Sequence, residues 1–140
     1  AGIEAVVPKD IHLMQWNKFM LNTAYNTISG LLLANYGQLD QKAVKELAYG
    51  VCAEVQAVAS AEGVRIPDSF IEENHNLVIT LGDGKTSMCQ DLEAGRTTEN
   101  EWFAGSVAAL GRKHDIPTPI CRTLSLLVQA KEAISFMALA

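Results

Sequence analysis

The chain has 140 residues, of which 49% are hydrophobic, so it can bury the core of one ordinary domain. Its formal charge of −5 argues against nucleic acid or an anionic membrane as a partner, since either would need a cationic surface. Valine and isoleucine rarely alternate with polar residues, which favours an all-α fold.

The first predicted element is a long helix. Residues 1–9 are expected to form an extended lead-in to it. Residues 11–34 then contain no proline and one internal glycine, which predicts a helix with Asp10 as its cap and an end near Tyr36-Gly37.

Glycine, proline and capping residues divide the rest of the chain into five further helices. They are expected from an Asp40 cap to Gly63, from Ser69 to Leu81, from Ser87 to Ala94, from a Thr98–Glu101 capping box to near His114, and from Thr118-Pro119 onward. Because such patterns can merge neighbouring elements, we expect about six to eight helices in one domain.

A polar stripe runs along the first predicted helix. Lys18, Asn22 and Asn26 are spaced four residues apart and share one helix face, and Gln15 and Ser29 extend the stripe. Large apolar residues flank the stripe, so it is expected to face a cleft or another segment. The alternative is that the lysine reaches water while the asparagines bond neighbouring backbone. Asparagine is a poor helix former, and its amide both donates and accepts, as a bound hydroxy or keto acid requires, which favours the cleft.

Two nucleotide-binding patterns are missing from the sequence. Gly84, Lys85 and Thr86 look like the end of a phosphate-binding loop, but the glycine that this loop needs five residues before Gly84 is Ile79. The G-x-G-x-x-G fingerprint after a strand is not found either. We therefore expect no nucleotide hydrolysis, and no binding of a nicotinamide cofactor by this chain alone.

The cysteines and histidines predict neither a metal site nor a disulfide framework. The cysteines are odd in number and widely spaced, which is typical of reduced core residues in a cytoplasmic protein. The histidines never lie at metal-ligand spacing from a cysteine or carboxylate, so we expect no metal cofactor. These residues are Cys52, Cys89, Cys121, His12, His75 and His114.

A second group of polar residues lies at 87–99. Ser87 can cap the short fourth helix, and Glu99 falls in the first turn of the predicted fifth helix, where the helix dipole favours a carboxylate. Each residue alone has that structural explanation. If the fold instead brings Ser87 and Glu99 beside the Lys18 stripe, both residues gain a role in binding a ligand there.

Three ordered motifs resemble one known family. The segments WNKFMLNTAYN at 16–26, SMCQDLEAGRTTE at 87–99 and GRKHDIPTP at 111–119 are similar to the C-terminal domain of ketopantoate reductase, also called 2-dehydropantoate 2-reductase. The likeness covers nearly the whole chain, and the ordered set is far more specific than any one motif. It implies an all-α domain of the 6-phosphogluconate dehydrogenase C-terminal-like type, preceded by a Rossmann domain that holds NADP as NADPH.

The same resemblance implies roles for five residues. Lys18 matches the family's general acid and Glu99 its essential glutamate, and both are expected to be catalytic. Asn22, Asn26 and Ser87 match substrate-binding residues. A positioned ammonium suits the reduction of a 2-keto acid, because hydride transfer leaves charge on an oxygen that the ammonium can stabilise and then protonate.

The chain departs from the family close to these positions. Asn100-Glu101 stands where the family usually reads I-D, Ala104-Gly105 where it reads N-G, and Pro119-Ile120-Cys121 where it reads P-x-N. The matched catalytic positions are intact. The departures therefore leave the identity of the 2-keto acid open.

We expect residues 1–140 to form one helical substrate-binding and catalytic domain without its N-terminal Rossmann cofactor domain, because the opening AGIEA resembles the junction into the second domain. Alone, it is expected to be inactive. Its expected partners are a small 2-keto acid, its own Rossmann domain and a second copy in a homodimer. The alternative is a helical interaction or dimerisation module without catalysis, in which the five site residues would be dispersed over solvent.

Overall fold

The computed structural model describes residues 10–138, and within that range it contains helices and no strand. The expected lead-in over residues 1–9 lies outside the described residues. The elements are α1 (Ile11–Leu32), η1 (Tyr36–Leu39), α2 (Lys42–Ala61), α3 (Ser69–Ile79), α4 (Ser87–Glu93), η2 (Asn100–Trp102), α5 (Ala104–His114) and α6 (Pro119–Ala138), where η denotes a 3-10 helix. The predicted all-α class is confirmed.

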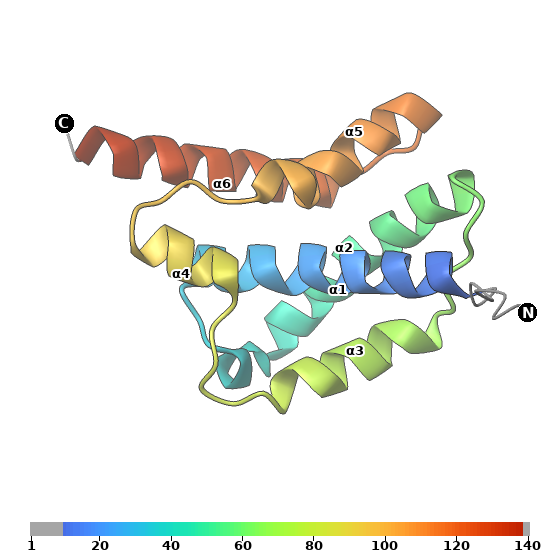
Figure 1. Cartoon of the computed structure of the whole chain (residues 1–140), viewed down its shortest axis with the longest axis horizontal. Helices are drawn as coiled ribbons and strands as arrows, with labels where there is room; N and C mark the ends of the chain where they lie inside the picture. Colours follow the sequence, from blue (N-terminus) through green and yellow to red (C-terminus); the bar gives the residue numbers. More distant parts are fainter. Residues whose placement is uncertain (1–9, 139–140) are drawn as a thin grey trace, which may run out of the picture.

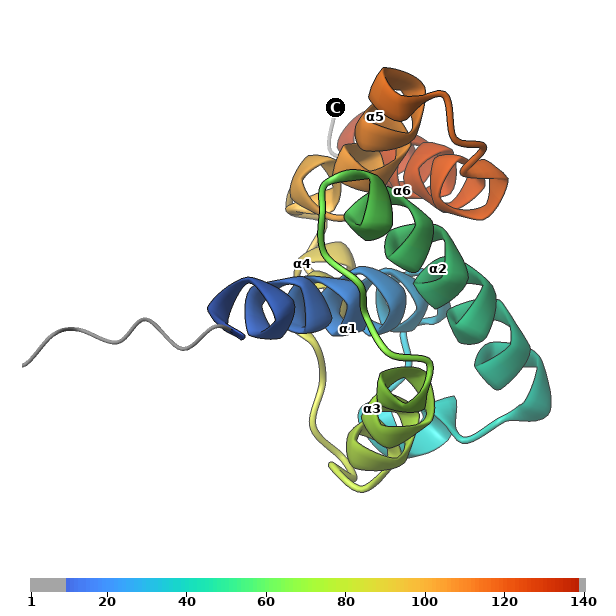
Figure 2. The ribbon, with the colours of Figure 1, turned by 90° about the vertical axis from the view of Figure 1, so that its right-hand side faces the viewer.

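Helix α1 crosses the middle of the molecule and contacts every other α-helix (Figure 1). In that view α2 lies behind α1, α4 lies in front of its C-terminal half, and the α5–α6 pair lies above it. Figure 2 shows α3 and the α5–α6 pair on opposite sides of α1. The main core forms where α1 meets α2, and its fully buried side chains include Met20, Ile28, Val51 and Val55.

The start of α2 differs from its prediction. Asn35 and Gln38 bond each other's backbone N–H groups reciprocally, at 2.9 and 3.0 Å, and so form a capping box for η1. This extra turn places Asp40 at the C-terminal end of η1, and Gln41 occupies the N-cap position of α2. Asp10 does occupy the N-cap position of α1, but its carboxylate makes no capping hydrogen bond there.

The predicted Thr98–Glu101 capping box is wrong. Thr98 donates its hydroxyl to Glu132 of α6 at 2.5 Å and accepts a hydrogen bond from the backbone N–H of Asn100 at 3.1 Å. This long-range partner holds residues 98–102 as a separate segment that ends in η2, and α5 begins only at Ala104. A local sequence pattern carries no information about such a partner from α6.

The start of α6 at Pro119 agrees with its prediction, and a buried carboxylate from α2 caps it. Glu54 accepts the backbone N–H groups of Ile120 and Cys121 at 2.9 and 2.8 Å. A carboxylate in this place satisfies two free N–H groups and favours the helix dipole.

All three cysteines are free and buried, as predicted for core residues. Burial raises the pKa of Cys52 to about 12, which keeps its thiol protonated and unreactive. No helix among residues 10–138 combines the length and the apolar character that a membrane span requires.

Candidate substrate site

The polar stripe lies on α1, with its residues at the predicted helical spacing. The side chain of Lys18 is exposed, whereas Asn22 and Asn26 are half-buried. Within residues 10–138 neither asparagine side chain forms a hydrogen bond, so the amides are not engaged with neighbouring backbone. Residues four apart on a helix have Cβ atoms about 6 Å apart, so successive members of the stripe can contact one small ligand.

One end of the stripe is closed by α4. Gly30 lies one turn beyond Asn26, and a Cβ atom built on it would come within 2.9 Å of Met88 Cγ and 3.0 Å of Leu92 Cδ1. The absence of a side chain at Gly30 therefore lets α4 pack closely against α1 (Figure 1). The hydroxyls of Ser29 and Thr86 hydrogen-bond across this junction at 2.5 Å.

Ser87 is the next residue after this junction, so the structure places it near the Asn26 end of the stripe. Its suggested capping role is wrong, because Thr86 is the N-cap of α4 and accepts the backbone N–H of Cys89 at 3.1 Å. Ser87 is exposed, and its hydroxyl makes no hydrogen bond within the described chain. The capping explanation for this serine is therefore removed.

Glu99 lies immediately before η2 rather than inside a helix. The segment that carries it is anchored to α1 by Phe103, whose ring centroid lies 6.5 Å from that of Phe19. Glu99 is exposed, and the four ion pairs found among residues 10–138 include neither Glu99 nor Lys18. No direct bond joins these two residues, and the placing of Glu99 beside Lys18 stays a prediction.

A pocket of about 270 Å³ adjoins the stripe between α1 and α5. Gln15, Trp16 and Phe19 line it from α1, and Ser106 and Leu110 line it from α5. The rings of Trp16 and Phe19 pack edge to face, with centroids 5.5 Å apart. Together with Leu110 they make the wall of the pocket largely apolar. The sequence had indicated Gln15 as part of the stripe and Trp16 and Phe19 among its apolar flanks. It gave no sign of Ser106 and Leu110, because the contribution of α5 depends on how the helices pack.

Two side-chain hydrogen bonds, one buried and one partly buried, fix α1 against α3. Tyr25 and His75 hydrogen-bond through Oη and Nδ1 at 2.9 Å, and the Asn74 side chain donates to Asn17 Oδ1 at 2.8 Å. Burial, helped by the charge of Lys45, lowers the pKa of His75, so this histidine is held neutral. No group of metal-ligating side chains occurs within residues 10–138.

Comparison with known proteins identifies the family of this arrangement. The sequence profile described as "Ketopantoate reductase PanE/ApbA C terminal" matches residues 10–132. The chain is 34% identical over 130 residues to 2-dehydropantoate 2-reductase of Mesorhizobium japonicum, covering 92% of this chain and 40% of that protein. It is 32% identical over 129 residues to the Halobacterium salinarum protein of the same name, covering 91% and 43% respectively.

Solved structures agree with this assignment. A PanE/ApbA family ketopantoate reductase from Ralstonia eutropha superposes with a TM-score of 0.83 at 31% identity, covering 91% of this chain and 43% of that one. D-mandelate dehydrogenase in a ternary structure with NADH and anilino(oxo)acetate superposes with a TM-score of 0.86 at 26% identity, covering 91% and 72%.

The chain spans less than half the length of these two curated relatives. Within that length, the profile match covers every helix up to the middle of α6, including the polar stripe, α4 and the segment of Glu99. The chain therefore belongs to the ketopantoate reductase family, of which it represents the helical C-terminal domain.

Proposed function

We propose that this chain is the substrate-binding and catalytic half of an NADPH-dependent reductase of 2-keto acids, of the ketopantoate-to-pantoate type. The observation that carries the proposal is the stripe on α1, where an exposed lysine shares a helix face with two amides that form no side-chain hydrogen bond within residues 10–138, next to the packed helix α4. Family membership adds support, because the curated relatives are named 2-dehydropantoate 2-reductases.

The N-terminal cofactor domain is part of this proposal. The bound nicotinamide would supply the hydride that reduces the keto carbon. Lys18 would stabilise the charge that develops on the keto oxygen and then donate a proton to it, which yields the 2-hydroxy acid. Because the lysine is exposed on the open side of α1, its side chain is free to reach a substrate held between the two domains.

The remaining residues would hold the keto acid in place. The amides of Asn22 and Asn26 can donate to the carboxylate and keto oxygens, and Ser87 can add a hydroxyl from the start of α4. Glu99 would accept a hydrogen bond from the substrate and keep Lys18 protonated when the site closes. These roles follow from the family resemblance, and the packing of α4 against α1 supports the part given to Ser87.

The pocket between α1 and α5 is suited to the substituent of the substrate. Its walls include Trp16 and Phe19, and Gln15 connects it to the stripe. D-mandelate dehydrogenase, which shares this fold at 26% identity, was solved with anilino(oxo)acetate, an aromatic 2-oxo acid derivative. We infer that branched or aromatic 2-keto acids are accepted in preference to pyruvate, since a methyl group would leave the pocket unfilled.

The test is steady-state kinetics of the complete enzyme, in which this chain is joined to its cofactor domain, on a panel of 2-keto acids. Lys18→Ala should lower kcat by roughly two to four orders of magnitude, as is typical of the loss of a general acid, while cofactor affinity is retained. Asn22→Ala should chiefly raise KM, because the amide binds the ground state and the transition state alike.

Lys42→Ala is a matched control, since it removes an exposed lysine at the start of α2. It should leave both constants unchanged. If Lys18→Ala had the same kcat as the parent enzyme, the lysine would have no part in the chemistry, and a binding or dimerisation role for the domain would be favoured.

A further inference from the structure

The third sequence motif, residues 111–119, has no part in the proposed substrate site. The structure uses it to build the turn between α5 and α6. A Cβ atom on Gly111 would lie 2.7 Å from the backbone oxygen of Ile116 and 2.7 Å from Thr118 Cγ2, so only glycine lets the turn pack directly on α5. Pro117 and Pro119 restrict the backbone of the same turn. The motif therefore makes a stiff loop of fixed shape.

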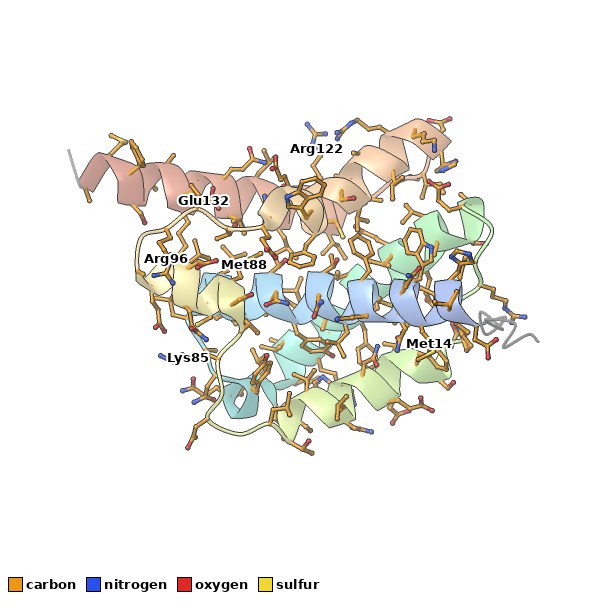
Figure 3. All side chains as sticks on the ribbon, viewed as in Figure 1. Met14, Lys85, Met88, Arg96, Arg122 and Glu132 are labelled. Carbon is orange, nitrogen blue, oxygen red and sulfur yellow. The ribbon has the colours of Figure 1, made fainter. Side chains whose placement is uncertain are left out.

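This turn borders a pocket of about 430 Å³. Arg112 from the last turn of α5 and Arg122 from the first turns of α6 both line it, and Thr118 and Ala108 contribute to its wall. Figure 3 shows Arg122 projecting beside α5, on the side of the α5–α6 pair that faces away from α1. The pocket is therefore separate from the substrate site on α1.

The two guanidinium groups have no acidic partner in the described part of the chain. Lys85, Arg96 and Lys113 each pair with a carboxylate, whereas the ion pairs among residues 10–138 include neither Arg112 nor Arg122. Asp115, the acidic residue of the turn, does not line the pocket. Both arginines are exposed, so water screens their mutual repulsion, and an anion in the pocket that they line would be attracted to both.

Helix electrostatics explain one of these arginines and not the other. A cation in the last turn of a helix, as Arg112 is, interacts favourably with the helix dipole. Arg122 lies close to the N-terminus of α6, where the dipole disfavours a cation. Glu54 accepts the backbone N–H groups of Ile120 and Cys121 at that end, and among residues 10–138 it forms no ion pair with Arg122.

We propose that this pocket binds the phosphate group of a small phosphomonoester. Two guanidinium forks match the oxygens of a phosphate, which carries a charge of about −1.5 to −2 near neutral pH. Thr118 lines the pocket, and its hydroxyl, which has no hydrogen-bond partner within residues 10–138, can add a donor. The apolar part of the wall, Ala108 and Ile116, leaves room for the organic part of such a molecule.

The inference is tested by calorimetric titration of the 140-residue chain with phenyl phosphate and, separately, with inorganic phosphate, in chloride buffer. Saturable binding of phenyl phosphate is expected, and tighter binding of this probe than of inorganic phosphate would assign the site to a phosphomonoester rather than to free phosphate. Arg122→Gln should weaken binding roughly tenfold or more, the effect of losing a charged hydrogen-bond partner. Arg112→Gln should act similarly, and Arg122→Lys should restore binding only in part, because lysine lacks the bidentate fork.

Arg65→Gln is the matched control, because Arg65 is also exposed and lies outside the pocket, between α2 and α3. It should leave phenyl phosphate binding within about twofold of the parent chain. Equal losses in Arg65→Gln and Arg122→Gln would mean unspecific attraction to positive charge and would overturn the proposal, as would the absence of saturable binding of either probe. Circular dichroism confirms that each variant retains its helices, and Arg122→Lys serves if a glutamine variant does not fold.

Discussion

The two halves of α1 differ sharply in burial. From Thr23 to Gly30 all residues but Asn26 are buried, whereas from Ile11 to Phe19 every residue is exposed or half-buried. One helix thus forms the centre of the core and the wall of the candidate site. The polar stripe runs from the open half into the buried half.

The difference shows how a polar site can be held in place without being buried itself. In the buried half, α4 packs on Gly30 and the Ser29–Thr86 hydrogen bond locks the junction. In the open half, Lys18 has no protein partner among residues 10–138. The buried half supplies the free energy that fixes the helix, and the open half is left available for a ligand. Substitutions in the two halves should therefore act on different properties.

The largest loss of stability is expected from Gly30→Val. Even a single Cβ atom would come within 3.0 Å of Leu92 Cδ1, and valine adds two methyl groups to this close contact. Overpacking of this kind costs about 1–3 kcal/mol in the free energy of unfolding. Urea denaturation measures the change. Ala57→Val, an exposed position on α2, is the control and should cost only the small helix-propensity difference between the two residues.

A smaller loss, about 1 kcal/mol, is expected from Ser29→Ala. The change removes the hydroxyl that bonds Thr86 at 2.5 Å across the junction, and it leaves a buried polar group with one partner fewer. Alanine is the better helix former and offsets part of this cost. Ser60→Ala, at an exposed site on α2, should be neutral or slightly stabilising in the same urea titration. Equal effects of the two substitutions would mean that the junction contributes nothing to stability.

The division of α1 was only partly predictable from the sequence. The long helix, its polar stripe and the all-α class follow from local spacing, because side chains four residues apart share a face. The sequence left open whether Asn22 and Asn26 bond nearby backbone. Within residues 10–138 their side chains form no such bond, which only the packed structure reveals. Gly30 gave no signal of its role, because its meaning depends on α4, which lies more than fifty residues later in the chain.

The segment of Glu99 shows the same limit. Thr98 and Glu101 match a capping box, and a local pattern cannot register that Glu132 competes for the threonine hydroxyl. The family resemblance, in contrast, predicts Ser87 and Glu99 beside the stripe on α1 although neither lies close to it in sequence, and this stays a prediction. Relations between distant segments came from the resemblance, and local geometry came from the spacing of residues.

The buried half should also make stability depend on pH. His75 is held neutral beside Tyr25, with a pKa below its ordinary value of 6.5 chiefly because of burial. At pH values between the pKa of His75 in the folded chain and its ordinary pKa, this histidine is protonated in the unfolded chain but not in the folded one. The free energy of unfolding should therefore fall as pH drops below about 6.5. Above that pH both states are neutral and the histidine adds no slope.

The measurement is urea denaturation at several pH values between 5 and 8. His75→Gln retains a side-chain partner for Tyr25 and should reduce the loss of stability toward low pH. His12→Gln alters an exposed histidine in the open half of α1 and should leave the pH profile unchanged. A profile that is the same in both variants would assign the slope to other groups.

The smallest effect on stability is expected from Lys18→Ala, in the open half. The lysine is exposed and makes no ion pair or hydrogen bond within the described chain, so nothing in the fold depends on its charge. Surface substitutions of this kind change the free energy of unfolding by less than about 0.5 kcal/mol, and alanine is the slightly better helix former. The urea midpoint of the variant should therefore match that of the parent chain. A clear loss of stability would show that the ammonium supports the fold, and a fall in kcat on Lys18→Ala could then no longer be assigned to chemistry alone.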